Sequence, residues 1–239
     1  MLGKFTDGFD EFAWGTDYTE AGPWQFRFYV PFDPQGLADL YQDANMDMCD
    51  VLERMQTMSG VVHLGGYTTE IHEQVEMTEN CWGQYAHNNQ PSHHILYMFN
   101  GLDRDGVRGS CAAKGQYYLR KVQRELYNYR PAMYAGDEDN GEMSAWYVMS
   151  SLGLFSLSPA STELIFGTPL YAHVDILIDT ELNTILTIIA ENNTPNNVYI
   201  QSVSWNGIDI SHRNGIEYDE LMRGGSLIFV MGSKPYQNV

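Results

Sequence analysis

The sequence predicts an α+β fold, with helices in the first part of the chain and strands in the second. Apolar residues between residues 37 and 58 recur at intervals of three and four, the spacing of a helix with one buried face. After Pro159 the pattern changes to alternating or β-branched runs separated by turn residues. Because strands and helices do not alternate along the chain, a doubly wound α/β fold is not expected.

The first predicted elements are an irregular entry segment and one long helix. Residues 1–35 are rich in aromatic residues, Gly and Pro, and the run WQFRFYVPFDP contains prolines that interrupt a regular helix. Helical spacing then begins at Leu37 and continues to Met58. Gly60 is expected to end this helix.

Three more helices are predicted before the strands. One begins at Pro91, because proline is favoured at the first position of a helix. The next runs from about Gly115 to a stop at Arg130–Pro131. The last starts at the acidic cluster Asp137–Asp139 and ends at Gly153, where a left-handed C-cap is expected.

The last part of the chain predicts a small antiparallel β unit. Its strand-like runs are VDILID, TILTIIAEN, NVYIQSVSWNG and GSLIFVMG. Turn signals such as Asn206–Gly207 and Gly224–Gly225 separate them. The change of pattern divides the chain into a helical part, residues 1–158, and a β-rich part, residues 159–239.

Composition excludes several classes of partner. With 31 Asp and Glu against 13 Lys and Arg, the formal charge of -18 would repel a nucleic acid backbone. No run approaches the roughly 18 apolar residues of a membrane span. The N-terminal MLGKFTDGFDEF has neither the basic n-region nor the apolar h-region of a signal peptide. Cys49, Cys81 and Cys111 form no CxxC pair, so we expect buried thiols.

Polar and aromatic residues occur together in three segments. They are DYTEAGPWQF (17–26), HNNQPSHH (87–94) and GDEDNGEMSAWY (136–147). Each segment lies in a loop before a predicted helix or in its first turn, and such loops can line one common pocket. Sugars suit this mixture, because their apolar faces stack on aromatic rings and their hydroxyls bond to charged acceptors.

Glu20 in the first segment allows two interpretations. It lies between Tyr18 and Trp24, and packing against those rings would partly desolvate it. Desolvation keeps a carboxyl group protonated near neutral pH, as a general acid requires. The alternative is a solvated glutamate in a loop.

The acidic cluster also allows two interpretations. Asp139 followed by Glu142 matches a capping box, and carboxylates are favourable at the start of a helix. Capping needs one acceptor, however, and so leaves a second role open for Asp137.

The segment HNNQPSHH is a weak candidate for metal binding. His93 and His94 are adjacent, so they face different sides of a helix and cannot bind one zinc ion as residues four apart do. The side-chain oxygens of Asn89 and Gln90 suit calcium better, although amides without a carboxylate make a weak site.

Taken together, these segments resemble the C-terminal portion of the catalytic region of glycoside hydrolase family 92. The similarity runs through YTEAGPWQFRFYVPFDPQGL, NNQPSHHILYMFN, GDEDNGEMSAWYVMSSLGLFSLSP, FGTPLYAHVDI and NNVYIQSVSWNG, which span nearly the whole chain. Members of the family are calcium-dependent, inverting exo-α-mannosidases. The resemblance therefore implies hydrolysis of terminal α-linked mannose, such as the α-1,2-mannose of N-glycans or mannans.

The resemblance also implies roles for single residues. Glu20 occupies the position of the family's general acid. Asp137 and Asp139 occupy the positions of the carboxylates that activate water in the family. Contact with the sugar is implied for Trp24, Asn89, His93, His94 and Glu142. Calcium is implied at Asn89 and Gln90, and the family's usual glutamate is replaced by Gln90, which weakens that site.

The members of the family that this chain resembles are much longer, with an N-terminal β-sandwich and a full (α/α)6 barrel. By this resemblance, residues 1–158 form a partial barrel, residues 159–239 follow it, and the chain is a fragment of a larger enzyme. The missing β-sandwich would be its partner, beside a mannose-containing glycan. A secreted, periplasmic or secretory-pathway location is the expectation for the whole protein. The alternative is an inactive fragment or a carbohydrate-binding pseudoenzyme.

Overall fold

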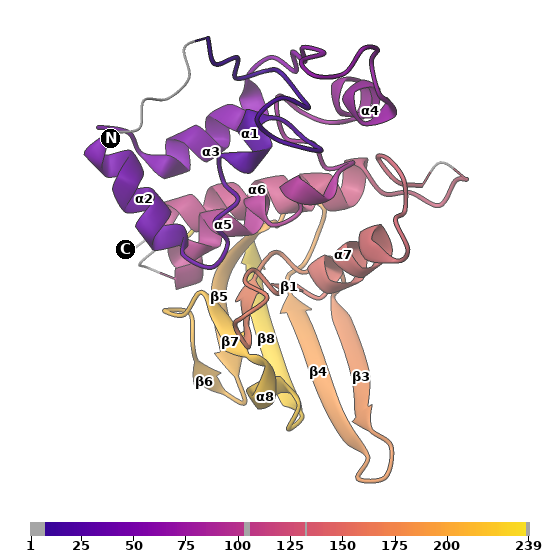
Figure 1. Ribbon diagram of the computed structural model, residues 1–239. Helices are drawn as coiled ribbons and strands as arrows, with labels where there is room; N and C mark the ends of the chain where they lie inside the picture. Colours follow the sequence, from indigo (N-terminus) through magenta and orange to yellow (C-terminus); the bar gives the residue numbers. More distant parts are fainter. Residues whose placement is uncertain (1–7, 103–105, 132, 238–239) are drawn as a thin grey trace.

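The computed structural model describes residues 8–102, 106–131 and 133–237. Helices gather at one end of the molecule and strands at the other (Figure 1). Helices α6 (Ser110–Glu125) and α7 (Glu142–Ser151) lie where the two parts meet. The predicted order of helices before strands is confirmed. Within the described ranges no helix has the length and apolar character needed to cross a membrane.

The long helix predicted over residues 37–58 is two helices. Asn45 adopts a left-handed φ of 57°, and Asp47 starts the second helix by accepting a hydrogen bond of 2.7 Å from the backbone N–H of Cys49. The helix-like spacing of apolar residues continues across this break, so the sequence pattern does not indicate where the first helix ends. Besides α6 and α7, the helices of the helical part are α1 (Pro23–Phe26), α2 (Pro34–Asp43), α3 (Met48–Thr57), α4 (His72–Asn80), α5 (Ile95–Gly101) and the 3-10 turns η1 (Gln90–Ser92) and η2 (Gly106–Arg108).

The other predicted helices are present with shifted bounds. Pro91 lies in η1, and the α-helix proper starts later, at Ile95. Helix α6 begins at Ser110, before the predicted Gly115. Gly153 has a φ of 79° just after α7, which confirms the predicted left-handed C-cap. Helices α1 and α4 were not predicted. Residues 1–7 of the entry segment lie outside the described residues.

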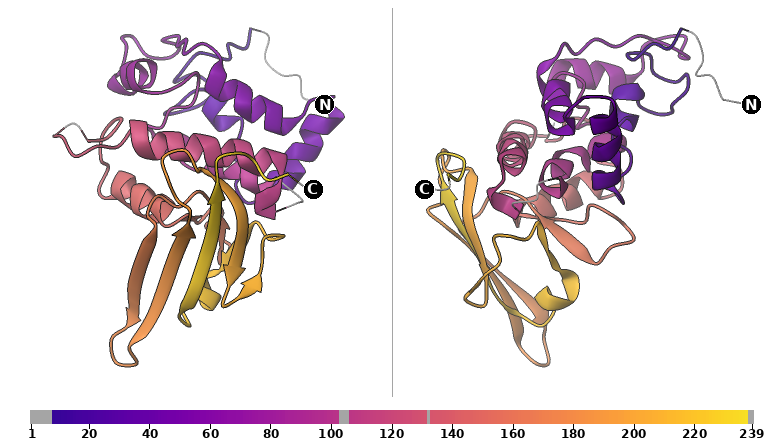
Figure 2. Two further views of the ribbon diagram at one scale, coloured as in Figure 1. Left: turned by 180° about the vertical axis from the view of Figure 1, so that it is seen from behind. Right: turned by 90° about the vertical axis from the view of Figure 1, so that its left-hand side faces the viewer.

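The strands form two sheets, and one pairing differs from the prediction. Strands β4 and β8 run parallel, with Leu186 opposite Gly225 and Glu191 opposite Val230. The expected wholly antiparallel unit is therefore wrong, because β5, β6, β7 and the short helix α8 (Tyr218–Leu221) intervene between these neighbours. Figure 2 shows the larger sheet from behind. Its order is β3 (His173–Asp179), β4 (Thr184–Glu191), β8 (Gly225–Gly232), β5 (Tyr199–Trp205) and β6 (Ile208–Asp209), and the smaller sheet contains β1 (Leu154–Phe155), β2 (Glu163–Phe166) and β7 (Gly215–Glu217).

A buried arginine joins the helical part to the β-rich part. Arg120 of α6 is 2 % exposed and donates to Thr168 Oγ1 at 3.0 Å, Asn193 Oδ1 at 3.0 Å and the carbonyl oxygen of Thr194 at 3.2 Å. Burial lowers the pKa of Arg120 to about 10. Its hydrogen bonds to several segments tie α6 to the loops that flank β3 and β4.

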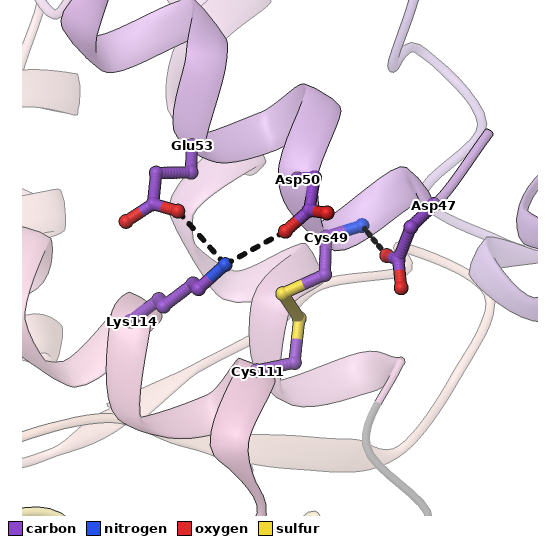
Figure 3. Close-up of a disulfide and its surroundings, with 6 residues drawn as sticks. All are labelled: Asp47, Cys49, Asp50, Glu53, Cys111 and Lys114. Atoms are coloured by element: carbon purple, nitrogen blue, oxygen red, sulfur yellow. Dashed lines mark hydrogen bonds and ion pairs between the residues drawn. A yellow bond between two sulfur atoms is a disulfide. The ribbon is translucent and has the colours of Figure 1, made fainter.

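The cysteines differ from the prediction of buried thiols. Cys49 of α3 and Cys111 of α6 form a disulfide, with their Cα atoms 5.9 Å apart (Figure 3). Cys81 is the free thiol, and burial raises its pKa to about 11. Even spacing of cysteines along the sequence gave no information on which pair would meet in space.

Close contact between α5 and α6 depends on Gly115. A Cβ atom at this position would lie 2.7 Å from Phe99 Cβ and 3.1 Å from the carbonyl oxygen of Leu96. We therefore expect Gly115→Ala to lower the free energy of unfolding by about 1–3 kcal/mol, because the helices must move apart. Urea denaturation measures this change. Gly101→Ala is the control, since its nearest neighbour is the side-chain end of Leu157 at 3.3 Å; an equal loss in both variants would contradict the packing explanation.

Candidate active site

Residues from all three predicted polar segments line one cavity of about 670 Å³. Most of its walls are helix starts and the loops before them, as the sequence predicted, whereas Phe26 and Tyr29 lie at and beyond the end of α1. Another cavity, of about 660 Å³, lies beside the disulfide and contains none of the predicted site residues. The lining of the candidate site is Thr19, Glu20, Phe26, Tyr29, Gln90, Pro91, Asp139, Asn140 and Glu142.

Two adjacent amides connect the carboxylates of this cavity. The Nδ2 atom of Asn89 donates to Glu20 Oε1 at 3.3 Å. The Nε2 atom of Gln90 donates to Asp139 Oδ2. Asn89 immediately precedes η1, and Gln90 is its first residue. A single turn of chain therefore contacts both Glu20 and Asp139. The arrangement brings together two carboxylates that are far apart in the sequence.

The surroundings of Glu20 differ from the prediction. Glu20 is exposed, and it is not enclosed between Tyr18 and Trp24. Tyr18 stacks on Phe26 with ring centroids 5.1 Å apart. Trp24 is 1 % exposed in the helical core, with the guanidinium of Arg27 4.0 Å from its ring centroid, and it does not line the cavity. The rings near Glu20 therefore pack mainly on other residues.

Asp137 and Asp139 face different surroundings. Asp139 lines the cavity, whereas Asp137 is exposed and is absent from the cavity lining. Asp137 instead contributes to the raised pKa of His72 in α4, whose main cause is a hydrogen bond with Glu76. Of the two aspartates, Asp139 is thus the one that the cavity can present to a ligand.

Helix capping is done by Glu138 and not by the predicted pair Asp139 and Glu142. Glu138 accepts hydrogen bonds from the backbone N–H of Gly141 at 2.6 Å and of Ser144 at 3.2 Å, and from Ser144 Oγ at 2.7 Å. The hydrogen bond from Ser144 is the main cause of the lowered pKa of Glu138. Left-handed φ angles of 58° at Asp139 and 102° at Gly141 turn the chain here. The capping function is thus met while the Asp139 side chain lies in the cavity.

Glu142 and His93 form a pair at the cavity wall. His93 Nδ1 lies 3.0 Å from Glu142 Oε1, and His93 Nε2 lies 2.9 Å from the carbonyl oxygen of His87. Glu142 lines the cavity, while His93 is 4 % exposed behind it. The hydrogen bond with His93 lowers the pKa of Glu142.

His94 lies behind the cavity and does not line it. Its Nε2 donates to the carbonyl oxygen of Phe28 at 2.8 Å, and its ring forms a T-shaped contact with Tyr29, with the ring centroids 5.4 Å apart. Burial lowers the pKa of His94 to about 4. The neutral ring of His94 therefore packs behind Tyr29, a residue of the cavity lining.

The buried His94 makes stability depend on pH. Its folded pKa lies below the unfolded value of about 6.5, so the unfolded chain takes up more protons as the pH falls, and stability is lost. We expect this group to lower the free energy of unfolding by about 2 kcal/mol between about pH 7 and about pH 5. Urea denaturation at both pH values measures the loss. In His94→Gln the loss should be smaller by that amount, and an unchanged pH dependence would contradict the assignment.

Two aromatic residues of the site were not predicted. Phe26 and Tyr29 line the cavity, and Tyr29 is 53 % exposed. Both belong to the aromatic run WQFRFYV of the predicted entry segment, and Phe26 is also the last residue of the polar segment 17–26. The density of rings there was a signal, but periodicity could not tell which of them face a ligand.

The two amides supply too few oxygen atoms for the implied calcium site. Asn89 and Gln90 each donate from the side-chain nitrogen to a carboxylate, so each can offer a cation only its one amide oxygen. The Oδ1 of Asn89 is buried without a hydrogen-bond partner, but Ca²⁺ takes about six to eight oxygen ligands. Across the described ranges, no group of three or more His, Cys, Asp or Glu could hold a metal ion. These residues do not by themselves form a calcium site.

Comparisons with known proteins agree with the sequence resemblance. Residues 1–233 match the family described as glycosyl hydrolase family 92 catalytic domain. The structure of a family GH92 α-mannosidase from Bacteroides thetaiotaomicron is similar, with 25% identity, a TM-score of 0.79 and coverage of 97% of this chain and 27% of that chain. Its complex with mannoimidazole has 25% identity and a TM-score of 0.80, and the match covers 97% and 29% of the two chains.

A family GH92 inverting mannosidase from Bacteroides thetaiotaomicron VPI-5482 is also similar. It has 34% identity and a TM-score of 0.77, and the match covers 98% of this chain and 30% of that chain. The present chain thus spans from 27% to 30% of the length of these relatives. No curated protein matches the chain.

Proposed function

The chain belongs to glycoside hydrolase family 92, and on this premise we propose that it supplies part of the active site of an enzyme that hydrolyses terminal α-linked mannose. The observation that carries the proposal is the pair Glu20 and Asp139, which line one cavity and are held by the neighbouring amides of Asn89 and Gln90. A relative of similar structure forms a complex with mannoimidazole, which supports a mannose-like ligand.

The proposed reaction proceeds with inversion. Glu20 gives its proton to the glycosidic oxygen as the bond from that oxygen to the anomeric carbon breaks. A water molecule attacks the same carbon from the opposite face, and Asp139 takes the proton of that water. Such enzymes place the two carboxyl groups about 6.5–9.5 Å apart, which leaves room for the water. Asp137 is the weaker candidate for the base, because it is outside the cavity lining.

Glu20 is proposed to contact the bound sugar directly. In the chain alone Glu20 is exposed to solvent, and it lines the cavity together with two aromatic rings. Phe26 and Tyr29 offer apolar ring faces to the same sugar.

The rest of the active site is proposed to come from the rest of the protein. Residues 1–158 would be the last helices of an (α/α)6 barrel, and residues 159–239 the β-rich unit that follows it. An N-terminal β-sandwich would be the further partner of this chain. The share of its relatives that the chain covers, 27% to 30%, supports this proposal.

Mannose release by the full-length protein tests the proposal. The substrate is the methyl glycoside of an α-1,2-linked mannobiose, whose blocked reducing end releases no free anomers of its own. Proton NMR should show β-mannose as the first product, before mutarotation mixes the anomers. First appearance of α-mannose would overturn the inverting mechanism, and no mannose at all would overturn the hydrolase.

A carbohydrate-binding protein without turnover is the second candidate. The exposed Glu20 and the amide of Gln90 beside Asp139 favour it. Calorimetry with mannose separates the candidates: heat of binding by a full-length protein that releases no mannose would support the second one.

A further inference from the structure

The turn that carries Asp139 has a backbone conformation that few sequences adopt. Asp139, Asn140 and Gly141 have φ angles of 58°, 59° and 102°, so three consecutive residues lie in the left-handed region. Residues with a Cβ atom are unfavourable there, because that atom approaches the following carbonyl oxygen. Asp and Asn tolerate the region better than most, but the conformation still needs support from its surroundings. The contacts that hold this turn therefore decide where the Asp139 side chain lies.

The carboxylate of Glu138 spans the turn. Its Oε2 accepts from the backbone N–H of Gly141 at 2.6 Å. Its Oε1 accepts from the backbone N–H and the Oγ of Ser144, at 3.2 Å and 2.7 Å. The first bond closes the turn around Asp139, and the other two attach it to the first turn of α7. Glu138 thus joins the chain before Asp139 to the chain that follows it.

A chain of hydroxyl groups holds the carboxylate in place. Ser144 gives its single O–H proton to Glu138 Oε1, so its oxygen must accept in the contact of 2.7 Å with the Tyr134 hydroxyl. Tyr134 therefore donates to Ser144, and Ser144 donates to Glu138. The Tyr134 ring forms a T-shaped contact with Tyr127 of the helical core, with the ring centroids 6.0 Å apart. The turn is thus connected to the core through Glu138.

We propose that Glu138 is a positioning residue that holds the Asp139 side chain in the cavity, in addition to capping α7. The importance of Asp139 rests on the proposed function, whereas the support of the turn by Glu138 does not. Glu138 itself does not line the cavity, so it acts through the backbone of the turn. Such an effect is large enough to measure, because a shift of about 1 Å in a reacting group can lower a rate roughly a hundredfold.

Kinetics of the full-length protein test the role of Glu138. In Glu138→Gln one carboxylate oxygen becomes an NH2 group, which cannot accept from Gly141 or Ser144. We expect kcat on α-mannosides to fall roughly tenfold to a hundredfold, with little change in KM, because Asp139 is displaced while the other cavity residues stay in place. In the Asp139→Asn background the same change should lower kcat less than about threefold, because the group that Glu138 positions is already lost. Equal losses in both backgrounds would overturn the proposal.

Two glycines supply a matched control for the shape of the turn. Gly141 and Gly207 have φ angles of 102° and 83°, and an added Cβ would meet nothing within 4 Å at either position. Alanine therefore strains only the backbone at each. Gly207 lies between β5 and β6 and does not line the cavity. Both variants should lose stability, but only Gly141→Ala should lose kcat, by roughly tenfold. Equal kcat in the two variants would overturn the proposal, also where Glu138→Gln does not fold.

Hydrogen exchange separates failure of this inference from failure of the proposed function. The backbone N–H groups of Gly141 and Ser144 bond to Glu138, so their exchange should be roughly tenfold faster in Glu138→Gln than in the wild type. Mass spectrometry of peptides that cover residues 137–147 measures this without any enzymatic activity. Unchanged exchange would overturn the support of the turn by Glu138.

The kinetic outcomes then divide in the same way. Faster exchange with an unchanged kcat in Glu138→Gln would overturn the positioning role and leave the proposed function standing. A wild-type full-length protein that releases no mannose would overturn the proposed function, and the positioning role with it.

Discussion

Replacing Glu20 by Gln is expected to lower kcat of the full-length protein on α-mannosides by roughly 10²- to 10⁴-fold, the usual loss when a general acid is removed. The amide keeps the shape of the side chain and its contact with Asn89, but it cannot give a proton to the leaving oxygen. An aryl mannoside with a good leaving group needs little protonation, so the loss should be much smaller on it. Steady-state assays on both substrates measure the difference.

Asp139→Asn should reduce kcat by a similar factor on both substrates, because activation of water does not depend on the leaving group. Asp137→Asn is the matched control, since Asp137 is a neighbouring carboxylate that does not line the cavity. A large loss in Asp137→Asn with full activity in Asp139→Asn would exchange their roles. Full activity in Glu20→Gln on both substrates would remove the proposed acid.

Much of the fold could be predicted because its signals are local. A proline at the start of a helical segment and a glycine after the end of α7 act within one turn of chain. Pro91 lies in a 3-10 turn just before the predicted helix, and Gly153 adopts the predicted left-handed conformation. The break at Asn45 and the parallel pairing of β4 with β8 could not be predicted from periodicity. The break leaves the apolar spacing unchanged, and the pairing depends on segments far apart in the chain.

The candidate site shows the same division. Its three segments were found because each combines carboxylates or amides with aromatic residues at a helix start. Which acid faces the cavity was not predictable, because consecutive carboxylates at 137–139 offer equal chemistry. The structure separates them by backbone conformation: Glu138 caps α7, and the left-handed turn at Asp139 leaves that side chain in the cavity.

Removing the disulfide between Cys49 and Cys111 is expected to have the largest effect on stability. The bond closes a loop with a sequence separation of 62, and loss of such a constraint on the unfolded chain costs roughly 4 kcal/mol. Cys49→Ser, Cys111→Ser and the double variant should therefore lose similar amounts in urea denaturation. Wild-type protein with a reductant should lose the same amount, since it tests the bond without changing the sequence.

Ion pairs beside the disulfide cannot replace it. Lys114 contacts Asp50 at 3.0 Å and Glu53 at 2.8 Å across the same two helices (Figure 3). These carboxylates are exposed, and exposed pairs contribute about 1 kcal/mol or less. Cys81→Ser is the control, because it removes a thiol outside the bond. If the reductant left the denaturation midpoint of the wild type unchanged, packing and these ion pairs would have to hold the contact between α3 and α6 without the disulfide.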